Sequence, residues 1–171
     1  MSLGDDDLRR LRETIADAQA AGRQGAWPFA AQVVGRDGVL ARVVNAVFAT
    51  GDPTAHAEVH ALREAARRVG RWDGLVGATL YASAEPCAMC AAAIHWAGIG
   101  RLVFGVGEPR LRRLYGPRPP FRPLTLSCRQ VLASGGADIE VQGPLIEDEA
   151  AQPHLAFWRS PAAANAAGDP T

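Results

Sequence analysis

The sequence predicts an α/β domain of the three-layer α/β/α type, with a mixed sheet of about five strands between its helices. After an initial pair of strands, apolar β-rich segments alternate with segments of helical periodicity. The 171 residues, 48% hydrophobic and 21% charged, suffice for one domain with its own core. We therefore predict a single domain over residues 1–159, followed by a disordered tail of small and Pro residues over 160–171.

The chain opens with a predicted helix and hairpin. Residues 5–21 start with acidic side chains and then space their apolar side chains as an amphipathic helix does. Residues 29–34 and 39–47 are rich in β-formers, and the Gly35-Arg36-Asp37-Gly38 segment between them is typical of a hairpin turn. These segments predict the first two strands.

The middle of the chain predicts two strand-to-helix units. Asp52 and Pro53 are typical cap and first residues of a helix, which we expect to run to residue 69. A strand over 78–82 then precedes a helix that Pro86 begins and that ends near residue 97, and another strand covers 101–106. The start of each helix follows a strand, which is where sites in such sheets lie.

The last third predicts less regular structure. Residues 107–123 are rich in Pro and Arg and predict a loop. A helix over 124–133, a strand over 139–141 and a final helix over 146–158, with Pro153 inside it, complete the expected elements.

Charge and cysteine usage exclude several classes of protein. The chain has 18 basic and 18 acidic residues, so no net charge points to nucleic acid or to an anionic membrane. No segment is apolar enough to span a bilayer and the amino terminus is acidic, so we expect a cytoplasmic protein without membrane contact. In that reducing compartment, Cys-x-x-Cys indicates metal binding or redox chemistry, and Cys128 is expected in the core.

Two short motifs carry metal-binding chemistry. Cys87 and Cys90 lie one helical turn apart, and a helix amino terminus stabilises thiolates. His56 and Glu58 are two residues apart, so both can address a site beyond the end of their helix but not one on its side. We predict that His56, Cys87 and Cys90 hold one Zn²⁺ with water as the fourth ligand, and that Glu58 is the catalytic proton acceptor.

Other interpretations of these motifs stay open from the residues alone. A Cys-x-x-Cys is often half of a structural zinc site, for which Cys128 or His60 would be the fourth ligand. The Cys pair also fits a redox role, which leaves His56 unexplained. A zincin-type site is disfavoured because that motif requires Glu directly after the first His, where this chain has Ala57.

The two motifs together resemble those of the cytidine deaminase-like superfamily of zinc deaminases. His56-Ala57-Glu58 and the segment Pro86-Cys87-Ala88-Met89-Cys90 carry the resemblance. It extends over roughly residues 28–106, and it is most similar to the guanine deaminase and tRNA-editing adenosine deaminase branch.

The resemblance implies a cytidine deaminase-like fold, one Zn²⁺ per subunit and hydrolytic deamination of a nucleobase or nucleoside. Water activated by zinc attacks the ring carbon that bears the amino group, while Glu58 moves the protons. It also implies six substrate-binding residues: Asn45, Phe29, Trp96, Ala57, Glu108 and Trp158. From the residues alone, Asn45 also fits the end of a strand, and the aromatic residues also fit a core.

The substrate expected from the resemblance is guanine or a related aminopurine, ahead of an amino-pyrimidine or a triazine. Guanine deaminases of this branch place an Asp in the loop after the fourth strand, where this chain has Gly107-Glu108-Pro109. Either Glu108 replaces that Asp or the substrate differs. Trp158 stands where this branch carries aromatic residues that close the pocket, sometimes from a neighbouring subunit, and a homodimer is expected.

Two alternative functions remain. The first is deamination of adenosine to inosine in tRNA, for which an Arg cluster would contact phosphates. That cluster consists of Arg110, Arg112, Arg113, Arg118 and Arg122, and a solvated loop is the simpler interpretation. The second, from another class, is a non-catalytic interaction module that zinc stabilises.

Overall fold

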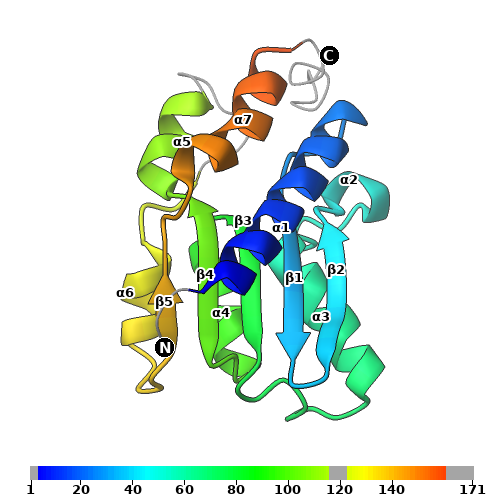
Figure 1. Cartoon of the computed structure of the whole chain (residues 1–171), viewed down its shortest axis with the longest axis vertical. Coiled ribbons are helices and arrows are strands. Elements are labelled where there is room, and N and C mark those ends of the chain that lie inside the picture. The colour runs from blue at the N-terminus through cyan, green and yellow to red at the C-terminus, as the bar shows by residue number, and fades with distance from the viewer. Residues whose placement is uncertain (1–3, 116–122, 161–171) are drawn as a thin grey trace.

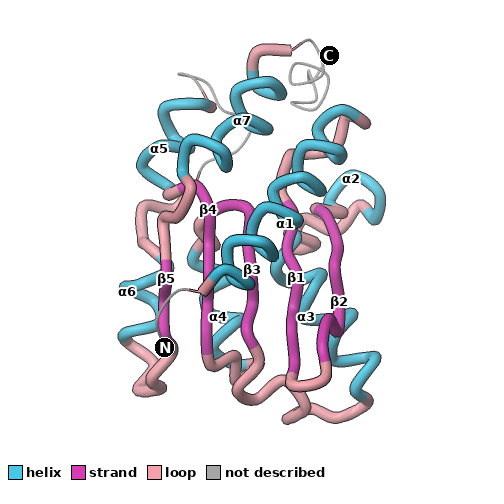
Figure 2. The backbone as a smooth tube through the Cα atoms, viewed as in Figure 1, coloured by secondary structure: helices cyan, strands magenta, loops and turns pink. Residues whose placement is uncertain are grey.

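A mixed five-stranded sheet forms the centre of the molecule (Figures 1 and 2). The computed structural model describes residues 4–115 and 123–160. The strands follow the order β2-β1-β3-β4-β5 across the sheet; β1 is antiparallel to both neighbours, and β3, β4 and β5 are parallel. Their bounds are β1 Ala30–Gly35, β2 Gly38–Val44, β3 Thr79–Ala84, β4 Arg101–Val106 and β5 Glu140–Gln142. The predicted sheet is confirmed.

Helices cover both faces of this sheet, so the predicted three-layer architecture is also confirmed (Figure 1). One layer contains α1 (Asp5–Arg23) and α7 (Glu147–Trp158), which pack against each other, with α5 (Glu108–Leu114) beside α7. The opposite layer contains α3 (Ala57–Val69), α4 (Ala88–Trp96) and α6 (Cys128–Ala133). A short helix, α2 (Val47–Thr50), follows β2.

Alternation along the strands separates two hydrophobic cores. Leu80 and Leu102 point toward the α3/α4 layer, while their neighbours Tyr81 and Val103 point toward the α1/α7 layer. Successive side chains of a strand point to opposite faces, and these central strands are buried on both. A sheet covered on both faces is held rigidly, which fixes the strand ends where the site lies.

Several predicted boundaries are wrong, among them the start of the helix expected over 124–133, which begins at Cys128. The helix expected from Asp52 begins at Ala57 instead, because the Asp52 carboxylate accepts hydrogen bonds from the Thr54 N–H, at 2.8 Å, and hydroxyl, which forms a turn that competes with the helix. The strand expected to reach residue 47 ends at Val44, and α2 follows. Part of the loop predicted over 107–123 is the helix α5, which Gly107 precedes. The predicted tail lies outside the described residues from 161 onward.

A close approach of α7 to β4 fixes the position of that helix. Gly105 of β4 lies beneath it, and a Cβ atom at this position would stand 2.6 Å from the Cβ of Ala150. No larger residue fits this contact without moving the helix or the strand, which explains the glycine. The first half of α7 is therefore held at a defined height above the sheet.

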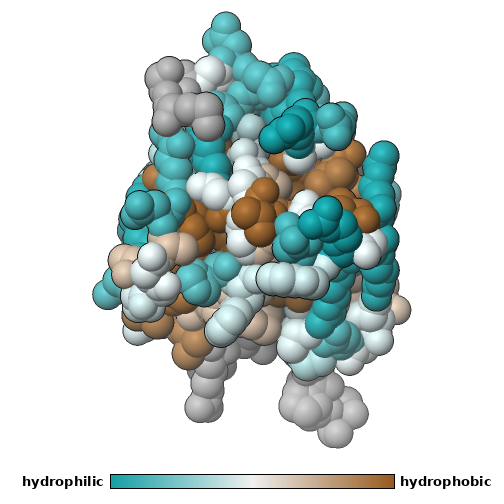
Figure 3. Space-filling model, turned by 90° about the horizontal axis from the view of Figure 1, so that it is seen from below, coloured by the Kyte–Doolittle hydropathy of each residue, from teal (hydrophilic) through white to brown (hydrophobic). Residues whose placement is uncertain are grey.

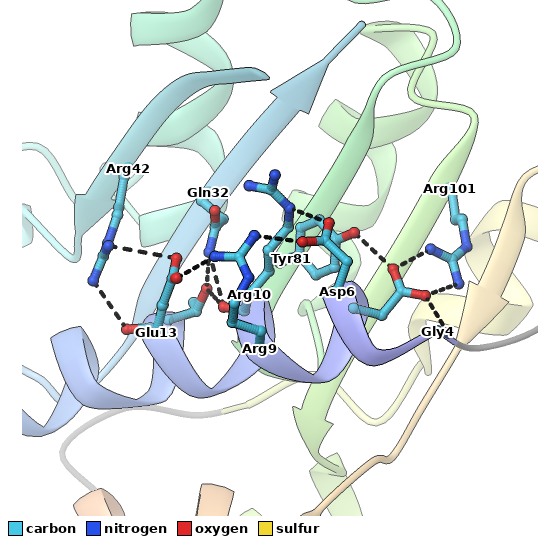
Figure 4. A network of polar contacts seen from close by, with 11 residues as sticks. Gly4, Asp6, Arg9, Arg10, Glu13, Gln32, Arg42, Tyr81 and Arg101 are labelled. Atoms are coloured by element: carbon cyan, nitrogen blue, oxygen red, sulfur yellow. Dashed lines mark hydrogen bonds and ion pairs between the residues drawn. The ribbon is translucent and has the colours of Figure 1, made fainter. Parts of the chain in front are cut away.

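A buried ion pair anchors α1 to the other side of the same face (Figure 4). The Asp7 carboxylate pairs with the Arg101 guanidinium, accepts a hydrogen bond from the Tyr81 hydroxyl at 2.7 Å, and accepts one from the Gly4 N–H at 2.9 Å. These contacts hold the pKa of Asp7 well below its ordinary value, with the Arg101 hydrogen bonds as the largest cause. The first turn of α1 is thus tied to β3 and β4.

The end of the molecule that carries the β1–β2 turn shows hydrophobic surface at its centre, with hydrophilic residues around it (Figure 3). The loop between α3 and β3 reaches this end, and its Trp72 and Val76 are 90% and 69% exposed. No helix in the described part of the chain is both long and apolar enough to cross a membrane.

The Asp7–Arg101 pair predicts a specific loss of stability. Asp7→Asn removes the buried, hydrogen-bonded partner of the Arg101 charge and leaves only Glu140, at 3.4 Å. We therefore expect the free energy of unfolding at neutral pH to fall by about 3 kcal/mol. The pKa of Asp7 is lowered by folding, so its contribution is present above the ordinary value of 3.8 and is lost as the pH falls below it. Urea unfolding from neutral to acidic pH measures both effects.

Asp6→Asn is the matched control for this test. Asp6 lies one position earlier on α1 and makes exposed ion pairs with Arg9 and Arg10, so its loss should cost under about 1 kcal/mol. Equal destabilisation by the two substitutions would contradict the role assigned to the buried pair.

Candidate active site

Two helix amino termini meet at one edge of the sheet and carry the predicted metal ligands. His56 is the residue that caps α3, and Cys87 caps α4, directly after β3. Cys90 lies in the first turn of α4 and is buried. The backbone N–H groups at a helix start have no partners within the helix, so both helices direct positive potential at this point.

The three side chains form an equilateral arrangement. His56 Nδ1 lies 3.6 Å from Cys87 Sγ and 3.6 Å from Cys90 Sγ, and the two sulfurs are also 3.6 Å apart. Tetrahedral zinc with sulfur at about 2.3 Å and nitrogen at about 2.05 Å requires ligand separations of about 3.6 to 3.8 Å. The geometry therefore fits a zinc ion, and the sulfurs are too far apart for a disulfide.

No fourth ligand atom from His, Cys, Asp or Glu lies within 4.8 Å of all three, among residues 4–115 and 123–160. Cys128 is buried elsewhere in the core, and His60 Nδ1 contacts the carbonyl of Val44 at 3.0 Å. Both alternatives for a closed structural site are thus engaged away from this group. Three protein ligands with an open position are typical of a catalytic zinc.

Glu58 lies beside the three ligands. It is the second residue of α3, and its Oε2 is 3.5 Å from Cys90 Sγ. Because α3 begins only at Ala57, His56 precedes the helix and its side chain reaches forward, while Glu58 in the first turn reaches the same region. This explains how residues two apart share one site.

Burial and neighbouring charges shift the titration of this group. Hydrogen bonding from Cys90 and His56 lowers the pKa of Cys87 to about 4, so one thiolate is present at neutral pH. The hydrogen bond with Cys87 raises the pKa of His56. Burial, together with the Cys87 charge, raises the pKa of Glu58 to about 7. A carboxyl that titrates near neutrality can both accept and donate a proton, although a bound dication would lower this value.

A cavity of about 350 Å³ opens directly onto these residues. Both His56 and Glu58 lie in its wall. Its apolar lining includes Trp27, Phe29, Met89, Leu111 and Tyr115, and its polar lining includes Asn45, Glu85, Glu108 and Ser127. An apolar pocket with a few polar groups and a titratable carboxyl is the common form of a small-molecule site.

Three of the predicted substrate contacts lie in this cavity wall. Phe29 and Asn45 are joined, because the Asn45 N–H donates to the Phe29 carbonyl at 2.9 Å. The Asn45 Oδ1 accepts from the Val47 N–H at 3.2 Å, which fixes the direction of the amide. Glu108 accepts from Arg112 Nε at 2.9 Å, while burial raises its pKa. Contact with a substrate stays a prediction for all three.

Three other predicted contacts are placed away from the cavity wall. Trp96 is 84% exposed at the far end of α4, more than two turns from Cys87, so this chain does not bring it to the cavity wall. Its contact with a substrate stays a prediction. The Ala57 side chain is buried in the core, which leaves only its backbone N–H at the helix start. Trp158 contacts Tyr115 with ring centroids 5.1 Å apart and lies behind the wall.

Sequence reasoning missed part of the site. Glu85 accepts hydrogen bonds from the N–H groups of Glu108, at 2.9 Å, and Cys128, at 3.2 Å, and so ties the starts of α5 and α6 to the end of β3. Tyr115 lines the cavity at the end of α5, one turn after Leu111. This spacing of apolar side chains indicates a helix, but the Pro and Arg residues of the segment favoured the prediction of a loop.

The Arg cluster is only partly available to an external anion. Arg110 pairs with Asp148 at 2.7 Å, and Arg112 binds Glu108 and the carbonyl of Leu124. Arg118 and Arg122 lie outside the described residues. At least two members of the cluster thus have partners within the protein.

Comparisons with known proteins agree with this geometry. The family described as cytidine and deoxycytidylate deaminase zinc-binding region matches residues 5–106. A probable cytosine deaminase of Schizosaccharomyces pombe is 41% identical over 157 residues, which cover 91% of this chain and 94% of that protein. A tRNA-specific adenosine deaminase of Agrobacterium fabrum is 41% identical over 96 residues, 56% of this chain and 62% of that protein.

The solved structure of a guanine deaminase from Nitrosomonas europaea superposes with a TM-score of 0.75 at 26% identity. The superposition covers 94% of this chain and 88% of that one. The resemblance stated from the motifs is confirmed by these matches.

The ligand set predicts the zinc content of three variants. His56→Ala and Cys90→Ala each leave two ligands, so the zinc-to-protein ratio of the purified protein should fall well below that of the wild type. Cys128→Ala is the control, because this buried cysteine lies outside the group and should retain its zinc. Mass spectrometry of the metal gives the ratio, and an unchanged ratio in either ligand variant would refute that assignment.

Proposed function

This chain belongs to the cytidine and deoxycytidylate deaminase zinc-binding family, whose members are hydrolytic enzymes, and on this premise we propose that it deaminates a free nucleobase. The observation that supports the proposal most is the arrangement of three zinc-type ligands and a buried carboxyl at the wall of one base-sized apolar cavity. Water replaces the amino group of the base, giving a carbonyl and ammonia.

His56, Cys87 and Cys90 would hold the zinc ion, which when bound supplies the polarisation that makes water nucleophilic at neutral pH. Glu58 accepts a proton from the attacking water and delivers it to the ring nitrogen. It then carries the second proton to the departing ammonia. Glu58 lies beside Cys90 and in the cavity wall, which suits proton transfer in both directions, and the apolar cavity excludes other water.

We propose cytosine as the first substrate. The matched zinc-binding region ends at residue 106, whereas Glu108, Leu111, Tyr115 and Ser127 of the cavity wall follow it. Substrate choice therefore depends on a part of the chain that only a longer alignment covers. The cytosine deaminase relative is aligned over 91% of this chain, which includes that part.

Guanine is the second candidate, and it is the purine expected from the motifs. The guanine deaminase structure superposes over 94% of the chain, so its cavity wall is comparable as well. The partners that Arg110 and Arg112 have within the protein argue against tRNA as the substrate. A homodimer and a cytoplasmic location stay predictions.

A substrate panel tests the choice of base. We expect ammonia release to be fastest with cytosine, slower with guanine, and slowest with the corresponding nucleosides, because the cavity suits a single planar ring system. Inosine formation in tRNA is measured in parallel. Turnover of tRNA alone, with no free base consumed, would exclude the proposed substrate class.

The acid/base role of Glu58 separates an enzyme from a silent zinc module. Glu58→Ala should lower the deamination rate about a hundredfold to ten-thousandfold and leave the zinc content unchanged. Glu64→Ala is the control and should change neither, because Glu64 lies on the same helix, is partly exposed and pairs with Arg67. Loss of zinc together with Glu58 would favour a structural metal site.

A further inference from the structure

His154 on α7 is fully buried although the proposed reaction does not use it. Its side chain has 0% exposure, and burial lowers its pKa to about 3, so the imidazole is neutral. Nδ1 accepts a long hydrogen bond from Trp158 Nε1 at 3.4 Å, whereas Nε2 has no hydrogen-bond partner among the described residues. A buried nitrogen without a hydrogen-bond partner is destabilising, so an apolar side chain would fill the same space at a lower cost in free energy.

One side of the imidazole supports Phe29. The two rings meet edge to face, with centroids 4.8 Å apart and planes at 63°. Phe29 lies in the cavity wall, and its carbonyl accepts the Asn45 N–H. The position of His154 thus affects the position of Phe29 directly. Through the Phe29 backbone it also affects the position of Asn45.

The other side of the imidazole leads to Tyr115. The Trp158 indole that donates to His154 Nδ1 also meets the Tyr115 ring at 5.1 Å and 84°. Tyr115 belongs to the cavity wall contributed by the end of α5. Phe29 and Tyr115 come from segments far apart in the chain. His154 contacts Phe29 directly, and the Trp158 indole lies between His154 and Tyr115 and contacts both.

The helix that carries His154 is itself firmly placed. Ala150, one turn earlier, packs on Gly105 of β4, and α7 also packs along α1. His154 therefore has a fixed height above the sheet.

We propose that His154 is a positioning residue, which sets the spacing of the aromatic cavity walls at Phe29 and Tyr115 and thereby the affinity for a planar base. The identity of the base rests on the proposed function. The role of His154 rests on the ring contacts and the hydrogen bond.

Two substitutions separate the two sides of the imidazole. His154→Phe keeps a ring against Phe29 and removes the acceptor of the Trp158 indole N–H. His154→Asn keeps an acceptor near the place of Nδ1 and removes the ring. Each should raise the KM for cytosine, or for guanine if the panel selects it, about three- to tenfold. That is the loss expected for one hydrogen bond in His154→Phe and for one aromatic contact in His154→Asn. The kcat should stay within about twofold, and the zinc content should not change, because neither variant alters the reacting groups.

His95→Asn is the matched control. His95 is a partly buried histidine that meets an aromatic ring, Trp96, at the end of α4 remote from the site. If it raises KM as much as the His154 variants do, or if both His154 variants keep the wild-type KM, the inference is overturned.

The indole N–H resonance of Trp158, assigned with Trp158→Phe, gives a readout that needs no turnover. It should shift in His154→Phe and stay near its wild-type position in His154→Asn. If the wild-type chain converts no base at all, the proposed function fails, and this resonance alone decides the inference: an unchanged position in His154→Phe overturns it.

Discussion

The site depends on the convergence of two helix amino termini at one edge of the sheet. The start of α4 follows β3 directly, and the start of α3 is delayed until Ala57, so that His56 and Cys87 both cap their helices at the same point. Hydrogen bonds with Cys90 and His56 then lower the pKa of Cys87, and the positive potential at a helix start also favours its thiolate form. If either helix began a turn earlier or later, the three ligand atoms would no longer be equidistant.

The rest of the fold holds that edge from both sides. On the face of the sheet that α3 and α4 cover, a hydrophobic core packs these helices against β3 and β4. On the opposite face, the Asp7–Arg101 pair fixes α1 and the Gly105–Ala150 contact fixes α7. The chain thus divides into two parts by role. The segment up to residue 106 contains the three candidate metal ligands and Glu58, and the segment after it provides much of the cavity that would select the base.

Much of this could be predicted from the sequence, because it rests on local patterns. The β-rich strand segments are a local pattern, and the sheet follows from them. The spacing of Cys87 and Cys90 is also local, and the close approach of their sulfur atoms follows from it. Asp52 and Pro53 predict a helix start because these residues suit a cap and a first helical position. The Asp52 carboxylate instead accepts hydrogen bonds from Thr54, and the turn that they form delays the helix until Ala57.

The cavity wall was less predictable from the sequence, because its contacts join segments that are distant in the chain. Trp96 shares a helix with the zinc motif, but it lies at the opposite end of α4 and is exposed. Glu85 and Tyr115 gain their roles only when α5 and α6 fold over the end of β3.

The most direct test of the account is the coordination shell of the metal, measured by X-ray absorption at the zinc edge on the full chain. The three-ligand site predicts two sulfur atoms at about 2.3 Å and two lighter atoms at about 2.0 to 2.1 Å, from His56 and an exchangeable water. A shell with three sulfurs would place Cys128 on the metal and close the site, and a shell with fewer than two would remove the Cys87/Cys90 pair; either result would contradict the account.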